Sequence, residues 1–191
     1  GKTTCTSCTP GAYQDAKGLL TCKSCPVGTS NGNTGSISIA ACSSCATGKF
    51  QDEIGNDECK VCGPGTYQDE TGQTGCKSCA AGFYNTASES KTISACIPCG
   101  TGKFSTTAAA TSESVCQLCE LGTVNAATGQ TTCTSCTSGA YQDAKGLLTC
   151  KSCPIGSANA NTGSVSIDAC FPCAFGKFQD DIGKDECKIC G

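Results

Sequence analysis

Cysteine is the residue whose number and spacing in this 191-residue chain could do chemistry. All 22 cysteines fall into eleven Cys-x-x-Cys motifs. The step between successive motifs takes only two values, a short one as from Cys5 to Cys22 and a long one as from Cys22 to Cys42, which indicates one module in tandem. Such motifs can form disulfides, bind zinc or exchange electrons. The motifs begin at Cys5, Cys22, Cys42, Cys59, Cys76, Cys96, Cys116, Cys133, Cys150, Cys170 and Cys187.

Three disulfide arrangements fit this spacing. In the first, the second cysteine of each motif bonds the first cysteine of the next, and each bond closes a loop of about 15 residues worth roughly 3 kcal/mol. The pairs would be Cys8–Cys22, Cys25–Cys42, Cys45–Cys59, Cys62–Cys76, Cys79–Cys96, Cys99–Cys116, Cys119–Cys133, Cys136–Cys150, Cys153–Cys170 and Cys173–Cys187. Cys5 and Cys190 would then find partners in neighbouring repeats. The second arrangement crosses adjacent motifs and leaves one of the eleven unpaired; the third bonds cysteines within each motif and closes only very small loops.

Zinc is the fourth alternative, because two successive motifs, such as those from Cys5 to Cys25, have an acceptable spacing for a four-thiolate site. Zinc sites take motifs two at a time, however, with linkers that differ from the spacing within a site. The motif number is odd and the spacings show no such division, so the sequence favours disulfides and predicts no metal or other cofactor. A thioredoxin-like redox site would need a βαβ setting, which the sequence lacks.

Glycine and aromatic residues must position these cysteines. A glycine follows each motif by three residues in ten of ten cases, which predicts a positive φ angle or close approach of another strand. An aromatic residue follows that glycine by two residues in seven units, and we expect its ring to cover the nearest disulfide. The seven are Tyr13, Phe50, Tyr67, Tyr84, Phe104, Tyr141 and Phe178; Ser30, Val124 and Ala158 are the exceptions.

Two kinds of loop complete the units. Five of the six short units continue as aromatic-Gln-Asp-x-x-Gly, which predicts a hairpin turn with Asp bonded to its own backbone and Gly in the left-handed region. Long units instead alternate polar and apolar residues, as at 36–39 and 164–167, which favours a strand. We therefore predict a small disulfide-rich, mostly β fold, an elongated rod of stacked β-hairpin units with almost no helix.

The charged residues have ordinary interpretations. Calcium could be bound by the turn aspartates, but they offer too few oxygen ligands in close sequence, so turn chemistry is favoured. These residues are Asp15, Asp52, Asp69, Asp143 and Asp180. The lysines that follow the first cysteine of a motif are interpreted as solvated surface. They are Lys23, Lys60, Lys77, Lys151 and Lys188.

Composition excludes several functions. Without histidine the chain lacks the usual general base, and we predict that it is not an enzyme. All 13 basic residues are lysine and the net charge is −3, so nucleic acid is not an expected partner. No apolar run approaches the roughly 18 residues needed for membrane insertion. Cysteine density itself indicates a secreted or cell-surface protein, since the cytosol keeps thiols reduced. Ser and Thr are abundant enough to carry O-linked glycans, and no Asn-x-Ser/Thr acceptor occurs.

A longer period lies over the short one. When Cys133 is laid onto Cys5, a shift of seven units, 133–191 aligns with 5–63 at 46 of 59 identical positions. We therefore predict a first super-repeat over 5–132 and the start of a second over 133–191, in one continuous rod and not in separate domains. The first residue is expected to be an internal or processed end of a longer parent chain.

The repeat resembles a known family. Its pattern at 59–79 and 133–153, Cys-x-x-Cys-x-x-Gly-x-Tyr-Gln-Asp-x-x-Gly-x-x-x-Cys-x-x-Cys, is similar to the ephrin-receptor-type cysteine-rich repeat found in surface proteins of algae and other protists and in animal receptors. It is also similar to the first disulfide loop of tumour-necrosis-factor-receptor modules. Because one cysteine of each motif there closes a loop and the other opens the next, this resemblance supports the first pairing. It implies an elongated extracellular module with no catalytic residues to transfer.

The expected function is structural. Near-identical long-range copies suit a rod, surface coat or filament subunit, such as a flagellar hair or cell-wall fibre, with self-association or other surface proteins as partners. The alternative is a ligand-binding ectodomain of a receptor or adhesin. For that alternative, a contact is expected at Phe171, Pro172 and Phe175, which replace Ser43, Ser44 and Thr47 of the first copy.

Overall fold

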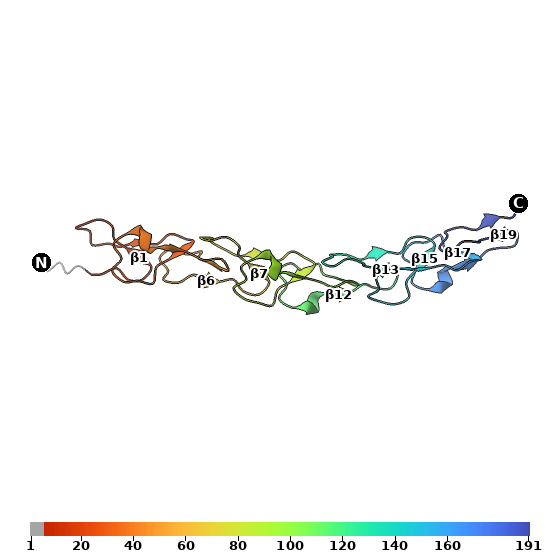
Figure 1. Ribbon diagram of the computed structural model, residues 1–191, viewed down its shortest axis with the longest axis horizontal. Helices are drawn as coiled ribbons and strands as arrows, with labels where there is room; N and C mark the ends of the chain where they lie inside the picture. The colour runs from red at the N-terminus through yellow and green to blue at the C-terminus, as the bar shows by residue number, and fades with distance from the viewer. Residues whose placement is uncertain (1–5) are drawn as a thin grey trace. The chain divides into compact units, whose positions relative to one another are not determined.

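The computed structural model describes residues 6–191 and consists of short antiparallel hairpins repeated along the chain (Figure 1). Each hairpin forms an isolated two-stranded sheet, and each strand has two residues. The pairs are β1 (Ala12–Tyr13) with β2 (Lys23–Ser24), β3 (Thr29–Ser30) with β4 (Ser43–Ser44), β5 (Lys49–Phe50) with β6 (Lys60–Val61), β7 (Thr66–Tyr67) with β8 (Lys77–Ser78), β9 (Phe83–Tyr84) with β10 (Ile97–Pro98), β11 (Lys103–Phe104) with β12 (Gln117–Leu118), β13 (Thr123–Val124) with β14 (Thr134–Ser135), β15 (Ala140–Tyr141) with β16 (Lys151–Ser152), β17 (Ser157–Ala158) with β18 (Phe171–Pro172), and β19 (Lys177–Phe178) with β20 (Lys188–Ile189).

One disulfide closes each hairpin, and we call each closed segment a finger. Fingers 1 to 10 are closed by Cys8–Cys22, Cys25–Cys42, Cys45–Cys59, Cys62–Cys76, Cys79–Cys96, Cys99–Cys116, Cys119–Cys133, Cys136–Cys150, Cys153–Cys170 and Cys173–Cys187. This is the first of the four arrangements considered above. Because each of these sulfur atoms is bonded to another, none is available as a thiolate ligand. Cys190 is free and exposed, and Cys5 lies outside the described residues.

The hairpin register follows the sequence motif. The two residues after the glycine that follows one motif pair with the two residues between the cysteines of the next motif, as Thr66 with Ser78 and Tyr67 with Lys77. The expected hairpins are confirmed, and they are shorter than a typical strand because the disulfide and the turn leave room for only two paired residues on each side.

The long fingers correct one expectation. The alternating segments at 36–39 and 164–167 were expected to be strands, but each leads into a single 3₁₀ turn. Ser38 caps one of these turns because its Oγ accepts the Ala40 N–H, and Ser112 and Ser166 cap theirs in the same way. The turns are η1 (Ile39–Ala41), η2 (Ile93–Ala95), η3 (Glu113–Val115) and η4 (Ile167–Ala169). Alternation failed as a strand signal because Ile37 is 81% exposed and pairs with no sheet, whereas the serine makes a local turn favourable.

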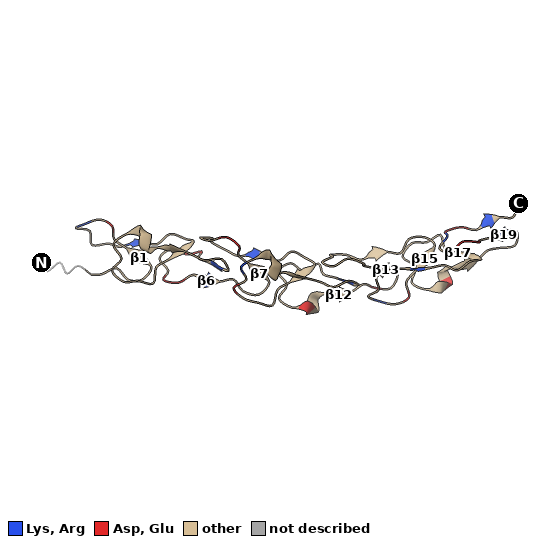
Figure 2. Cartoon of the chain, viewed as in Figure 1, with Lys and Arg blue, Asp and Glu red and all other residues tan. Residues whose placement is uncertain are grey.

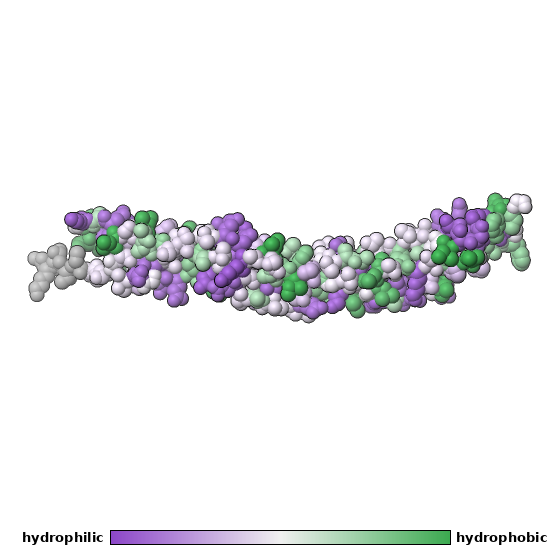
Figure 3. Space-filling model, in the orientation of Figure 1, coloured by the Kyte–Doolittle hydropathy of each residue, from purple (hydrophilic) through white to green (hydrophobic). Residues whose placement is uncertain are grey.

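The interior is made of sulfur and amides. The largest side chains that are fully buried are Gln51, Gln142, Asn31, Asn85 and Asn159, followed by half-cystines such as Cys25, Cys45 and Cys62. Tyr13, Tyr67 and Tyr141 are also buried, while Phe178 is 41% exposed. Apolar residues lie on the surface instead, among polar ones (Figure 3). Disulfides and hydrogen bonds therefore stabilise the fold in place of a hydrocarbon core.

Two compact units divide the chain. The first contains Gly1–Cys79, Asn85–Cys96 and Ala109–Thr111; the second contains Ala80–Tyr84, Ile97–Ala108 and Ser112–Gly191. The backbone hydrogen bonds between neighbouring fingers join residues of the same unit.

Candidate functional site: the junctions between fingers

The second cysteine of each motif lies at the centre of a junction. Cys25, Cys45 and Cys62 are fully buried, whereas the first cysteine of a motif is usually more exposed. The backbone of the buried cysteine makes two hydrogen bonds, one through its N–H and one through its carbonyl. Cys45, for example, donates its N–H to Gly28 of the preceding hairpin at 2.9 Å and accepts at its carbonyl the N–H of Gly72 in the next finger at 2.8 Å.

Three backbone hydrogen bonds join finger 3 to finger 4. Gly48 donates to the Gln68 carbonyl at 2.7 Å, Gln51 donates to the Gln73 carbonyl at 3.0 Å, and Gly72 donates back to Cys45. The second and third of these bonds occur at all nine junctions, and the first occurs at eight. A junction therefore depends mainly on main-chain groups, so short and long fingers can follow one another with the same pattern of bonds.

The donor of the third bond always has a positive φ angle. Five of these donors end short fingers and are the glycines expected in the left-handed region, such as Gly55 and Gly72, at φ 75° and 70°. Long fingers place Gly35, Glu89, Ala109 or Gly163 there instead. Glu89 and Ala109 are the positive-φ residues other than glycine in the described chain. This position was not predicted in long fingers, because its residue type varies there.

The glycine after each motif can contact the finger two places further on. A Cβ at Gly65 would lie 2.7 Å from the carbonyl carbon of Ala109, and a Cβ at Gly28 would lie 2.9 Å from that of Gly72. Both distances are far inside van der Waals contact, and both glycines also have φ near 80°. Both reasons predicted for this glycine, positive φ and close approach of backbone, are confirmed.

Glutamine holds the turn of the short fingers. Gln68 is 2% exposed; its Nε2 donates to the Gly75 carbonyl at 2.7 Å, and its Oε1 accepts the Glu70 N–H at 3.0 Å. Gln51, Gln142 and Gln179 make the same pair of bonds. Glutamine was not expected in this role, and its longer reach spans both ends of the loop. The expected bond of Asp to its own backbone also forms: at Asp69 it lowers the pKa of the carboxyl further, beside the larger effect of the hydrogen bond to Lys77.

Asparagine takes the equivalent position in three long fingers and reaches the finger before it. Asn85 donates through Nδ2 to the Thr66 carbonyl at 3.0 Å and to Ser90 Oγ at 2.9 Å. Its Oδ1 accepts the Ala87 N–H at 3.0 Å. Asn31 and Asn159 repeat this arrangement with Ser36 and Ser164. The signal Asn-x-x-x-x-Ser was present in the sequence and was not recognised.

An ion pair crosses the base of five short fingers. Lys77 Nζ lies 2.7 Å from Asp69 Oδ1, and the same pair recurs as Lys23–Asp15, Lys60–Asp52, Lys151–Asp143 and Lys188–Asp180. Hydrogen bonding to the lysine lowers the pKa of each of these aspartates, and the same bond raises the pKa of the lysine. Lys151 Nζ is also 5.9 Å from the centre of the Tyr141 ring. Figure 2 shows such charged residues spread along the chain. They were expected to be solvated, and they are exposed, but their pairing was not foreseen.

The three residues predicted as a contact lie together in sequence around one motif. Phe171 and Pro172 form β18, and Phe175 lies in the turn before β19. The Phe171 side chain is 64% exposed, and Phe175 is fully exposed. Their role in a contact stays a prediction.

Two other features are absent from residues 6–191, a metal-binding cluster and a membrane-spanning helix. No group of three or more His, Cys, Asp or Glu side chains there is placed to hold a metal ion. No helix in that range has the length and apolar character to cross a membrane.

Comparison with protein families finds one family whose model matches the repeat. The family described as tyrosine-protein kinase ephrin type A/B receptor-like matches the chain at residues 1–42, 39–72, 55–96 and 122–170, which together make up more than half of it. The chain belongs to this family. A comparison with curated proteins found no match.

Membership of the ephrin type A/B receptor-like family agrees with the resemblance noted in the sequence. Matches occur four times, as expected for a cysteine-rich repeat array. Together with the ten disulfides, ephrin-receptor-like repeats indicate an extracellular repeat protein, and disulfide-rich repeat families are typically non-catalytic.

Proposed function

We propose that the chain is a structural extracellular protein that acts as a rod, surface coat or filament subunit. The supporting observation is the junction, in which the same backbone hydrogen bonds follow from one finger to the next whatever the finger length. Such contacts between neighbours make stability a sum of local terms, so the array can be lengthened without changing its architecture. A protein selected to set a length needs this property more than it needs a pocket.

The glycine contacts should also make the array of fingers stiffer. Because the glycine after a motif touches the finger two places further on, a bend between two fingers would also disturb the contact with the third. Disulfides limit movement within each finger. We infer that the array resists bending, which suits a spacer or a fibre.

Small-angle X-ray scattering of the full chain tests the proposal. A compact domain of this chain length would have a radius of gyration of about 16 Å. We expect a value well above this, with a narrow cross-section, and the same scattering curve in low and high salt. A radius near that of a compact domain, or a curve typical of a flexible chain, would rule out the structural role.

A ligand-binding ectodomain is a second candidate because of one local feature. Phe171 and Phe175 are exposed, where the first copy has Ser43 and Thr47. Exposed aromatic residues are common at the centres of binding interfaces. If this candidate holds, the chain binds saturably to an extracellular protein and the exchange F171S with F175T abolishes binding. Equal binding by the exchanged variant would count against it.

A further inference from the structure

All six leucines of this protein are exposed, and four of them lie where finger 7 meets finger 8. We define the leucine cluster as Leu118, Leu121, Leu147 and Leu148, which are 49%, 39%, 39% and 45% exposed. Single exposed apolar residues are normal on a protein surface, but contiguous groups of them mark interaction sites. Sulfur and amides fill the interior, so these side chains are not needed for the core of a finger.

Contacts between the two fingers hold the leucine cluster together. A Cβ at Gly146 would lie 2.7 Å from Leu118 Cδ2, so the Leu118 side chain lies against the backbone next to Leu147. The residue before this glycine, Lys145, pairs through its Nζ with Glu120 Oε2 at 2.6 Å. The cluster therefore has an acidic half, Leu118 and Leu121 with Glu120, and a basic half, Leu147 and Leu148 with Lys145.

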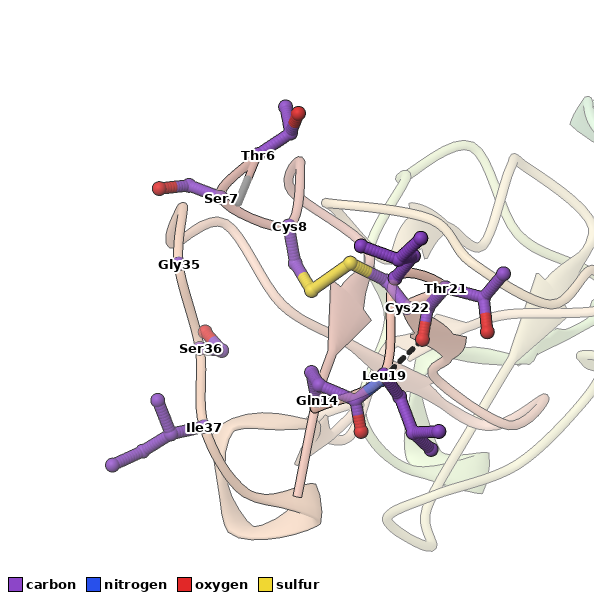
Figure 4. A pocket seen from close by; sticks show the side chains of 11 residues that line it. Thr6, Ser7, Cys8, Gln14, Leu19, Thr21, Cys22, Gly35, Ser36 and Ile37 are labelled. Carbon is purple, nitrogen blue, oxygen red and sulfur yellow. Dashed lines mark hydrogen bonds between the residues drawn. A yellow bond between two sulfur atoms is a disulfide. The ribbon is translucent and has the colours of Figure 1, made fainter. Parts of the chain in front are cut away.

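The leucine cluster is exposed although the fingers around it are all described. Finger 1 carries the same pair of leucines, Leu19 and Leu20, and they line an open hollow because no preceding finger is described there (Figure 4). At finger 8 the preceding finger is in place, since a Cβ at Gly122 would lie 3.2 Å from Val165 Cγ1. Fingers 9 and 10 follow it. The two leucines of finger 8 nevertheless stay 39% and 45% exposed, so a missing finger does not explain their exposure.

No other junction in residues 6–191 carries the complete cluster. Immediately before the second cysteine of a motif, leucine occurs only at Leu118. Two residues after that cysteine, leucine occurs only at Leu121. The fold does not require leucine at the first of these positions, because five other motifs have serine there, at Ser24, Ser44, Ser78, Ser135 and Ser152. The coincidence of both leucines with the pair on finger 8 therefore indicates a contact surface.

We propose that the leucine clusters of two copies of this chain pack against each other about a two-fold axis. The acidic half of each copy then faces the basic half of the other, so that leucines meet leucines and Glu120 meets Lys145 of the second copy. The Glu120 and Lys145 side chains are 68% and 52% exposed, so each can bind this second partner while keeping its first. The inference rests on the proposed structural function and names the lateral contact by which copies associate.

Charge complementarity selects the two-fold arrangement over a parallel one. Two copies lying parallel and in register would bring Glu120 against Glu120 and Lys145 against Lys145, and like charges in contact are unfavourable. A two-fold contact also uses the same surface on both copies, so it closes at a dimer. Four leucines on each side make a small interface, and the association is therefore expected to be weak.

Sedimentation equilibrium of the full chain tests this contact, with free thiols such as Cys190 alkylated so that they cannot form disulfides between copies. The average mass should rise with protein concentration toward twice that of the monomer and not beyond it. L118S should weaken association at least about tenfold, because a two-fold contact loses the side chain twice.

A matched pair of variants provides the control. L148T should weaken association to a similar degree, and the short fingers with Thr74 and Thr131 at the equivalent position show that threonine is compatible with the fold. L20T makes the same change one super-repeat earlier, in finger 1, where the acidic half is not present in residues 6–191. It should leave association unchanged.

Charge reversal separates this contact from other modes of association. E120K places only lysines at the contact and K145E only glutamates, so each variant alone should associate at least about tenfold more weakly. An equimolar mixture of the two should associate again, because lysine then faces glutamate across the axis. Both variants lose the ion pair within the chain, so recovery in the mixture reports the contact between copies.

A monomer at every concentration, masses greater than that of a dimer, or a mixture that associates no better than its components would each overturn the inference. The structural function would survive that result if scattering of the monomer still gave a long, narrow particle, and would fail with it if scattering gave a compact one.

Discussion

At the scale of single residues, glycines and amide side chains occupy the interior positions that large apolar side chains fill in most proteins. Gln142 is completely buried, and its amide is satisfied by Thr149 at 2.7 Å and Ala144 at 3.1 Å. No buried side-chain nitrogen or oxygen in the described residues lacks a partner. A polar interior is tolerable only under that condition, since each buried unpaired group costs about 1–3 kcal/mol.

The glycine after each motif gives a sharp test at this scale. G65A should lower the free energy of unfolding by several kcal/mol, because the added Cβ meets the Ala109 carbonyl and φ is 79°. G156A shares the positive φ but meets nothing within 4 Å, so it should cost only about 1–2 kcal/mol. G63A, which has neither constraint, should be nearly neutral. Urea unfolding followed by tyrosine circular dichroism measures all three, and equal losses for G65A and G156A would contradict the close approach.

At the scale of the finger, a hairpin with two-residue strands is too short to be stable by itself. The disulfide fixes its base, and glutamine or asparagine fixes the loop in every finger except finger 6, where Ser105 takes this position. In five fingers a Lys–Asp pair also crosses the base. Exposed ion pairs contribute little individually. Their repetition at equivalent positions nevertheless predicts a measurable dependence of stability on pH.

The sign of this dependence follows from the lowered aspartate pKa values. A carboxylate whose pKa is lower in the folded state stabilises the fold above its ordinary pKa of 3.8, and that contribution is lost as pH falls through the lowered value. Stability in urea should therefore decrease below about pH 4. A variant with Asn at Asp15, Asp52, Asp69, Asp143 and Asp180 should show a shallower decrease. Parallel curves for the two proteins would show that the pairs do not matter.

At the scale of the whole molecule, ten disulfides replace a common hydrophobic core. Each closes a loop of about 15 residues and contributes about 3 kcal/mol in the chain-entropy model. Fingers without their bonds have little else to hold them, because their leucines and isoleucines are exposed.

Reduction should therefore unfold the entire chain and not a part of it. We expect complete loss of slow amide hydrogen exchange after treatment with excess phosphine and alkylation at neutral pH. Alkylation without reductant modifies only accessible thiols such as Cys190 and should leave exchange unchanged. Protection that persisted in reduced fingers would reveal a core that the burial pattern does not show.

The sequence by itself determined the module, its two lengths, the hairpins and the glycine of close approach, because each is a local or strictly periodic signal. The 3₁₀ turns were not predicted, because the alternation at 36–39 shows which residues differ in polarity but not whether the apolar side chains are buried. Only the tertiary structure decided that Gln68 and Asn85 would be interior, that Lys77 would meet Asp69, and that Gly65 would lie against finger 6. The Lys77–Asp69 pair and the bonds of Gln68 depend on the hairpin register within one finger. The bond of Asn85 to Thr66 and the close approach of Gly65 to Ala109 depend on how neighbouring fingers are placed, and backbone hydrogen bonds set that placement.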